Sequence, residues 1–281
     1  MKSKIIKYAT LLLIAVTLVM LSGCTDSSYS EETPGEVMVE EGTTDMEDMD
    51  TEEAEEMTDT VTEDEIKDDM EDNSDSVIDP DDFSDPVDNP YFPLVVGTTF
   101  ILEGESDGED IRVEMYVTDQ TKEIMGVTTM VIREREWEDG ELIEDTFDWY
   151  ANDNEGNVWY FGEDSKEYDD GELVSTAGSW EAGVDGAEPG ILMKTDPQVG
   201  DVYQQEYYEG EAEDMAEVLS LDASATVEYG SFDNCLQTKE WTPLEPGVEE
   251  HKFYASGVGL LLEVAVTEGD ERLELVDITT D

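Results

Sequence analysis

Apolar and polar residues alternate along much of the chain after residue 90. Between residues 111 and 118, Ile111, Val113, Met115 and Val117 alternate with polar or amphipathic side chains. A period of two is that of a β-strand, because successive side chains point to opposite faces of a sheet. Residues 157–163 and 260–266 are apolar on both faces. The pattern therefore predicts half-buried strands, with central strands at these two runs.

Short Asp-Gly and related pairs separate the strand-like runs. They occur at residues 107–108, 139–140 and 170–171, and Glu155-Gly156 and Gly269-Asp270 have a similar composition. Tight hairpin turns require positive φ angles, which glycine adopts without steric cost. The sequence therefore predicts antiparallel strands joined by short hairpins.

The same pattern of residues occurs twice, 104 positions apart. A glycine, a tryptophan and an aromatic-Tyr-Ala triplet recur in order, and a Val-Gly pair recurs at an offset of 103. The corresponding residues are Gly126 and Gly230, Trp137 and Trp241, Tyr150 and Tyr254, Val158 and Leu262. We interpret this as a duplicated unit whose halves bury their apolar faces against each other, with these aromatic residues pointing inward.

Residues 210–221 contain good helix formers, but an offset of 104 aligns residues 218–221 with the predicted strand at 114–117. The duplication therefore favours a strand. The expected fold class is all-β: two related antiparallel meanders, packed as a sandwich or half-barrel.

The N-terminus has the features of an export signal. Three lysines lie within the first seven residues, an apolar run follows, and the segment ends in Leu-Ser-Gly-Cys24. This tetrapeptide resembles the lipobox of prokaryotic lipoproteins. We expect residues 1–23 to be a lipoprotein signal peptide and Cys24 to be lipidated, which would anchor an exported protein to the outer face of the cell membrane. An ordinary signal peptide or a single membrane anchor is the alternative.

Residues 24–88 hold 28 acidic residues and one basic residue, Lys67. Such a segment repels itself and has no apolar face to offset the entropy of ordering, so we expect a disordered acidic tether. The β domain should then span residues 89–281, with repeats at about 94–178 and 197–280.

Acidic residues number 77 against 13 Lys and Arg, for a formal net charge of −64. This charge excludes nucleic acid as a partner, because phosphates would be repelled. High acidity is typical of proteins adapted to high salt, with loosely held cations. A specific divalent-cation site or a cationic partner remains open.

Catalytic motifs are absent from the sequence. His251 is the single histidine, Cys235 lies in a predicted strand as a small buried residue, and no phosphate-binding loop or zinc motif occurs. Residues 152–156 lack the spacing of a calcium loop and are expected to form a hairpin tip. We expect no enzyme, no cofactor and no metal site. The alternative is a carboxylate-dependent hydrolase of envelope polymers.

Residues 178–193 connect the two copies and have no counterpart in the repeat. Four glycines, a proline and Trp180 lie in this segment. Added segments on a repeated scaffold often carry function, which makes Trp180, Glu181 and Asp185 candidate ligand-binding residues. The favoured alternative is a connector that inserts Trp180 into the core.

Two further motifs carry a resemblance to a known group. The sequence has Tyr-Phe-Pro-Leu at 91–94 with Gly-Thr-Thr-Phe at 97–100, and it ends with Tyr254-Ala255 followed by Gly-Val-Gly-Leu at 257–260. Over residues 89–281 it resembles exported prokaryotic lipoproteins of no established activity. Phe100 replaces an expected Trp, and Ser256 replaces an expected Pro.

The resemblance implies an exported β-rich lipoprotein and carries no activity or cofactor with it. Together with the composition, it leads us to expect a membrane-anchored, surface-exposed acidic lipoprotein. Its β domain would bind an apolar ligand or an envelope protein, or serve a structural role.

Overall fold

The computed structural model describes residues 78–106, 108–267 and 271–281. The signal peptide, Cys24 and most of the acidic segment lie outside this range. A single 3-10 turn, η2 (Pro80–Phe83), precedes the strands. None of the described residues forms a helix of the length and hydrophobicity that crossing a membrane requires.

The secondary structure of the described residues is otherwise β. The first nine strands are β1 (Thr98–Ser106), β2 (Glu109–Ile124), β3 (Val127–Glu138), β4 (Glu141–Asn152), β5 (Val158–Asp164), β6 (Glu167–Asp169), β7 (Glu172–Ser175), β8 (Trp180–Glu181) and β9 (Glu188–Met193). The remaining strands are β10 (Val202–Gln204), β11 (Glu206–Tyr207), β12 (Met215–Val227), β13 (Gly230–Trp241), β14 (Glu250–Ala255), β15 (Gly259–Ala265) and β16 (Arg272–Thr280).

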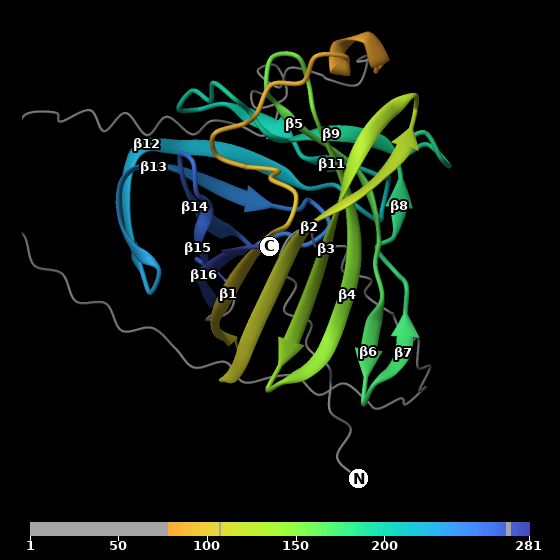
Figure 1. Cartoon of the computed structure of the whole chain (residues 1–281). Helices are drawn as coiled ribbons and strands as arrows, with labels where there is room; N and C mark the ends of the chain where they lie inside the picture. Colours follow the sequence, from red (N-terminus) through yellow and green to blue (C-terminus); the bar gives the residue numbers. More distant parts are fainter. Residues whose placement is uncertain (1–77, 107, 268–270) are drawn as a thin grey trace, which may run out of the picture. The chain divides into compact units, whose positions relative to one another are not determined.

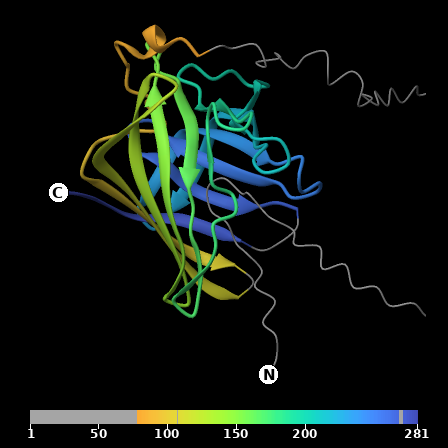
Figure 2. The same cartoon turned by 90° about the vertical axis from the view of Figure 1, so that its right-hand side faces the viewer.

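The strands form one antiparallel sheet in the order β10-β12-β13-β14-β15-β16-β1-β2-β3-β4-β5-β9-β11. The short strands β6, β7 and β8 are attached beside β4 and β5. Strands β10 and β11, at the two ends of this order, are separated by Gln205 alone, whose N–H donates to the carbonyl of Asp214 at 2.7 Å. The sheet therefore curls until its ends meet, and β2–β4 run steeply across β12–β15 (Figures 1 and 2).

The expected all-β class is confirmed. Of the two packings predicted, the curled sheet is close to the half-barrel, whereas a sandwich would need two separate sheets. Closure removes the exposed edges that an open sheet would present to other chains.

The hairpin predictions at residues 139–140 and 170–171 are confirmed. Asp139 and Gly140 join β3 to β4 with φ angles of 49° and 82°, and residues 170–171 join β6 to β7 with similar angles. Positive φ at both central positions matches the right-handed twist of the flanking strands. Residue 107 and the predicted tip at 269–270 lie outside the described residues.

The alternating pattern in β2 is confirmed, because Ile111, Val113, Met115 and Val117 are all buried. Residues 210–221 are not helical: β12 begins at Met215. The strand prediction for this segment is therefore confirmed.

The two halves share a succession of strands, β1–β5 in the first and β10 with β12–β15 in the second. Their registers differ, however. Met130 is paired with Tyr150, whereas Tyr254 is paired with Leu236 and not with Asn234, as a constant offset of 104 would require. The pairing registers of the two halves therefore differ by two residues between these strands, and the duplication itself stays a prediction.

The shared aromatic residues do not all point inward. Tyr150 and Tyr254 are buried, as expected. Trp137 and Trp241 are only half-buried, and each lies under a basic side chain: the guanidinium of Arg135 is 5.0 Å from the Trp137 ring, and the ammonium of Lys239 is 4.6 Å from the Trp241 ring. The expectation that both tryptophans are core residues is therefore wrong: each ring is half-buried and makes a cation–π contact.

Candidate functional site

The turn between β4 and β5 is longer than its counterpart in the second half. Residues 152–158 separate Ala151 from its cross-strand partner Trp159, whereas only residues 256–258 separate Ala255 from its partner Gly259. The first half thus carries four extra residues after its Tyr-Ala pair. The predicted hairpin tip at 152–156 is confirmed by the antiparallel pairing of β4 with β5.

Asp153 holds this longer turn in place. Its buried carboxylate accepts hydrogen bonds from the backbone N–H groups of Glu155 and Asn157, each at 2.9 Å, and from the Asn157 side chain at 2.8 Å. A fourth bond comes from the indole Nε1 of Trp159 at 2.9 Å. Four donors use the acceptor capacity of one carboxylate. Asp153 therefore positions the turn and the indole and is not a free acid or base.

The segment before β1 packs onto this turn. The backbone N–H of Asn154 donates to the carbonyl of Asp82 at 2.7 Å, and its side-chain oxygen accepts from the N–H of Asp85 at 2.7 Å. The Asn154 amide also donates to the carbonyl of Asp81 at 2.9 Å. The folded region therefore begins before residue 89, and the predicted domain boundary is too late.

Phe83 anchors the 3-10 turn η2 through aromatic contacts. Its ring meets Trp159 edge-on with centroids 6.1 Å apart, and it meets Phe161 in the same way at 5.7 Å. Asp79 caps the turn by accepting from the N–H of Asp81 at 3.0 Å. Both the cap and the aromatic contacts keep η2 over the strands (Figure 1).

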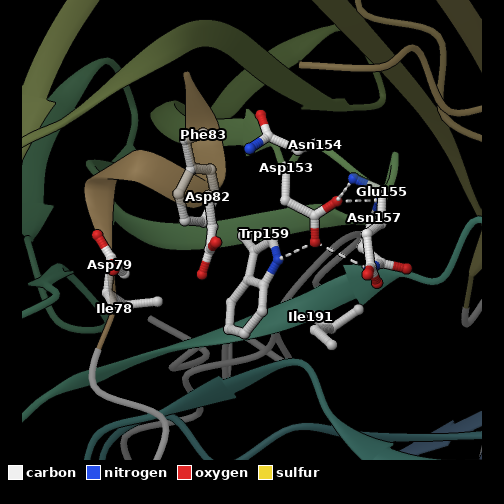
Figure 3. A pocket seen from close by; sticks show the side chains of 10 residues that line it. All are labelled: Ile78, Asp79, Asp82, Phe83, Asp153, Asn154, Glu155, Asn157, Trp159 and Ile191. Carbon is white, nitrogen blue, oxygen red and sulfur yellow. Dashed lines mark hydrogen bonds between the residues drawn. The ribbon is translucent and has the colours of Figure 1, made fainter. Parts of the chain in front are cut away.

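A pocket of about 460 Å³ lies between η2 and the β4–β5 turn, in the size range of small-molecule sites. Figure 3 shows the Trp159 indole at its centre, with carboxylates of the turn and of η2 on either side. No Lys, Arg or His is among its described lining residues. These are Ile78, Asp79, Asp82, Phe83, Asp153, Asn154, Glu155, Asn157, Trp159 and Ile191.

The structure places Trp180 away from this pocket. It is buried, its ring packs edge-on against Tyr160 with centroids 5.3 Å apart, and its Nε1 donates to Glu206 at 2.9 Å. Trp180 is thus inserted into the core, as the connector interpretation of residues 178–193 expects.

Glu181 and Asp185 do not join Trp180 in a common site. Glu181 forms an ion pair with Lys122 at 2.7 Å, and the Lys122 ammonium lies 3.1 Å from the centre of the Trp149 ring. Asp185 is exposed in a turn with φ of 53°. Ligand binding by this segment stays a prediction.

Acidic side chains occupy the interior of the curled sheet. Asp148 on β4 and Glu163 on β5 are cross-strand partners, and both are buried. The hydroxyl of Tyr160 lies 2.9 Å from one carboxyl and 2.8 Å from the other. A hydroxyl has one proton to donate, so the second contact requires a proton on a carboxyl group. The pair therefore shares at least one proton.

Burial is the main cause of this protonation. It raises the pKa of Asp148 to about 7, and burial followed by repulsion from Asp148 raises the pKa of Glu163 well above its ordinary value. Glu134 and Glu206 are also buried, and each has one carboxyl oxygen without a hydrogen-bond partner among the described residues. Carboxyl groups in such surroundings take up protons because an isolated buried charge is costly.

The second half neutralises its interior acids differently. The buried ammonium of Lys252 lies 3.1 Å from Glu240, 3.4 Å from Glu263 and 3.7 Å from Glu250. Burial opposes the charge of Lys252, but the three glutamates outweigh burial and raise its pKa well above the ordinary value.

Lys252 and Glu263 are cross-strand partners on β14 and β15, as Asp148 and Glu163 are on β4 and β5. The ammonium of Lys252 in the second half thus occupies the position that the carboxyl group of Asp148 has in the first half. The sequence alone does not single out these residues, because acidic residues are frequent throughout the chain. A detectable signal was present: Glu263 is the one acid within the apolar run 260–266.

We predict opposite effects for two tyrosine substitutions. Tyr160→Phe removes the hydroxyl between two buried carboxyls and should cost about 1–3 kcal/mol of unfolding free energy. Tyr150→Phe is the matched control: its hydroxyl is buried without a hydrogen-bond partner among the described residues, so removal should be neutral or stabilising. Urea unfolding of both variants measures the difference. Equal losses would contradict the shared-proton interpretation.

One oxygen each from Glu250, Glu263 and Glu271 lies within 4.8 Å of the other two. Lys252 already pairs with two of these residues, so its charge competes with any metal ion at this position.

The cysteine and the histidine, which are the remaining candidates for catalytic chemistry, have structural roles. Cys235 is buried in a core cluster, as expected, and His251 Nδ1 contacts the Gln237 amide at 3.1 Å.

Salt should stabilise the domain without a special effect of calcium. Residues 89–281 contain 49 acidic and 9 basic residues, so surface repulsion is strong and screening relieves it. We expect the melting temperature to rise steadily with KCl, and millimolar calcium to add only what its ionic strength predicts. A saturable rise at micromolar calcium, measured by thermal unfolding, would instead indicate a specific site.

No protein-family model and no curated protein matches the chain. Two solved structures match it. One is a Bacteroides fragilis protein with a YmcC-like fold that is inferred to be exported: 14% identity, TM-score 0.42, covering 68% of this chain and 100% of that one. The other is a Parabacteroides distasonis protein that is inferred to be a lipoprotein: 12% identity, TM-score 0.40, covering 69% of this chain and 100% of that one.

Proposed function

We propose that the protein is a membrane-anchored, surface-exposed lipoprotein whose β domain is a binding module without catalytic activity. Its ligand would enter the pocket between η2 and the β4–β5 turn. One observation carries this proposal: the β4–β5 turn, which is four residues longer than its counterpart in the second half, forms one wall of a pocket of about 460 Å³. Insertions on a rigid scaffold are frequent positions for binding sites.

Two cavities in the interior of the described sheet are much smaller than this pocket. Two described cavities, one beside Lys252 and Tyr254 and the other beside Phe100 and Leu102, each measure about 20 Å³. Such a volume holds about one water molecule. Neither cavity accommodates an acyl chain, which favours the pocket at the turn over these cavities for an apolar or amphipathic ligand.

The hydrolase alternative receives less support from the same pocket. A carboxyl group that acts as a general acid normally lies in an apolar environment. Asp79, Asp82 and Glu155 are exposed, and the buried Asp153 is saturated by four donors. These carboxylates suit the attraction of a ligand better than proton transfer to it.

The anchor is proposed from the sequence alone, because Cys24 lies outside the described residues. Cys24→Ala should abolish palmitate labelling and leave an uncleaved precursor or a soluble protein, since the thiol is the site of acylation. Metabolic labelling followed by membrane fractionation measures both effects. Labelled, membrane-bound Cys24→Ala protein would rule out lipidation at this residue.

The binding function is tested with the full-length chain in detergent. Thermal shift and NMR titration against a panel of short alkylamines, neutral sugars and peptides should give saturable binding by at least one member. Trp159→Leu should weaken that binding, whereas Leu173→Ala, a change to an exposed residue on β7 at the other end of the sheet, should not. Binding unaffected by Trp159→Leu, or no binding across the panel, would contradict the proposal.

A further inference from the structure

The tryptophans of this protein are distinguished by what lies over their rings. Three of the five carry a basic side chain of the same chain, and Trp180 is buried in the core. The three pairs are Lys122 over Trp149 at 3.1 Å, Arg135 over Trp137 at 5.0 Å and Lys239 over Trp241 at 4.6 Å. A cation over an indole thus occurs three times among the described residues.

Trp159 is the exception. Within the part of the chain that the structure describes, no Lys or Arg lies over its ring, although the ring is half-buried and lines the pocket. Phe83 contacts it edge-on, and the bond from Nε1 to Asp153 fixes the orientation of the indole. The ring is therefore pre-oriented, which lowers the entropy that it loses on binding.

The charges around this ring have one sign. Asp79, Asp82 and Glu155 are exposed carboxylates on the walls, and Asp153 lies behind them. An anionic ligand would be repelled by all four groups, whereas a cation would meet the carboxylates and the electron-rich face of the indole together. The apolar side chains of Ile78 and Ile191 line the same pocket, which suits a short hydrocarbon stem.

We propose that this pocket binds an organic cation, an ammonium or guanidinium group on a short apolar stem. The charged group lies over Trp159 between the carboxylates, and the stem packs on the isoleucines. This inference rests on the proposed binding function and specifies its ligand. The cation can be a free small molecule or the side chain of a Lys or Arg in a peptide, because both present the same chemistry.

The test compares n-butylammonium with 1-butanol, its neutral analogue, by NMR titration of the full-length chain in detergent. We expect n-butylammonium to bind at least about fivefold more tightly, and its affinity to fall as KCl is added. The blocked peptide acetyl-Gly-Lys-Gly-amide distinguishes the two sources. Binding of the peptide indicates a basic side chain as ligand, and binding of the free amine alone indicates a small molecule.

Charge-neutralising variants locate the site. The double variant Asp82→Asn, Glu155→Gln should weaken n-butylammonium binding about tenfold while leaving unfolding unchanged, because both residues are exposed. Its matched control, Glu141→Gln with Glu172→Gln, removes two exposed charges at the other end of the sheet and should change affinity less than twofold.

Two outcomes would overturn the inference. Equal affinity for n-butylammonium and 1-butanol would show that the charge of the ligand does not contribute to binding. Equal losses of affinity in both double variants would show that the net charge of the protein, and not the pocket carboxylates, determines the affinity. Neutral ligands that bind in a Trp159-dependent manner would overturn the cation inference and leave the binding function standing. An absence of binding by every ligand would overturn both.

Discussion

Replacing Lys252 with methionine is expected to destabilise the domain by about 3–5 kcal/mol, because it leaves buried carboxylates without their counter-charge. Lys252 is 4% exposed and Glu263 is fully buried, so water cannot replace the lost ammonium. Methionine retains most of the side-chain volume, which separates the loss of charge from the creation of a cavity. Urea unfolding at pH 8 measures the difference from the unmodified chain.

Lys239→Met is the matched control. Lys239 forms an ion pair with Glu217 at 2.7 Å, but both side chains are about a quarter exposed. Exposed pairs contribute roughly 0–1 kcal/mol, so this variant should lose far less. The Lys252→Met deficit should also shrink at pH 5, where protonation replaces the missing cation. Equal losses in the two variants would show that the interior acids are not held by Lys252.

The second large effect is an unusual dependence of stability on pH. Burial raises the folded-state pKa of Asp148 to about 7, far above the ordinary value of 3.8, and it does the same for Asp214. Between about pH 4 and pH 7 the folded state therefore binds more protons than the unfolded chain. The contribution of these two groups to the unfolding free energy should therefore be largest below about pH 4, fall as the pH rises from about 4 to about 7, and level off above about pH 7.

Each of these two groups should contribute a loss on the order of a few kcal/mol. Unfolding should be measured at pH 4.5 and pH 8 in 1 M KCl, which suppresses the repulsion between surface carboxylates. Asp148→Asn removes one titrating group and should flatten the profile. Stability that increases from pH 4.5 to pH 8 would contradict the protonated interior.

Local patterns were sufficient to predict much of the fold. Alternation identified β2, and the Asp-Gly pair at 139–140 identified the hairpin between β3 and β4, because both signals depend on neighbours in sequence. The buried position of Tyr150 also followed from the repeat. Trp137 did not follow the repeat: it is half-buried, and the guanidinium of Arg135, two residues earlier, lies over its ring.

The candidate site could not be predicted in the same way. It forms where Asp82 and Phe83 contact a turn that lies about 70 residues later in the chain. The spacing of apolar and polar residues does not predict a contact between segments so far apart in sequence. The interior acids were missed for a different reason. Asp148 and Glu163 are of the same residue types as the many acids on the solvated surface. Only the cross-strand pairing of β4 with β5 places them inside.

The most direct test of the account is to locate a bound cation. Intermolecular NOEs between n-butylammonium and the full-length chain should connect the butyl protons with the Trp159 indole and with Ile191. Amide shifts should change most at residues 81–83 and 153–157. NOEs to residues 180–185, or amide shifts confined to β12–β16, would contradict the assignment of ligand binding to the pocket at the β4–β5 turn.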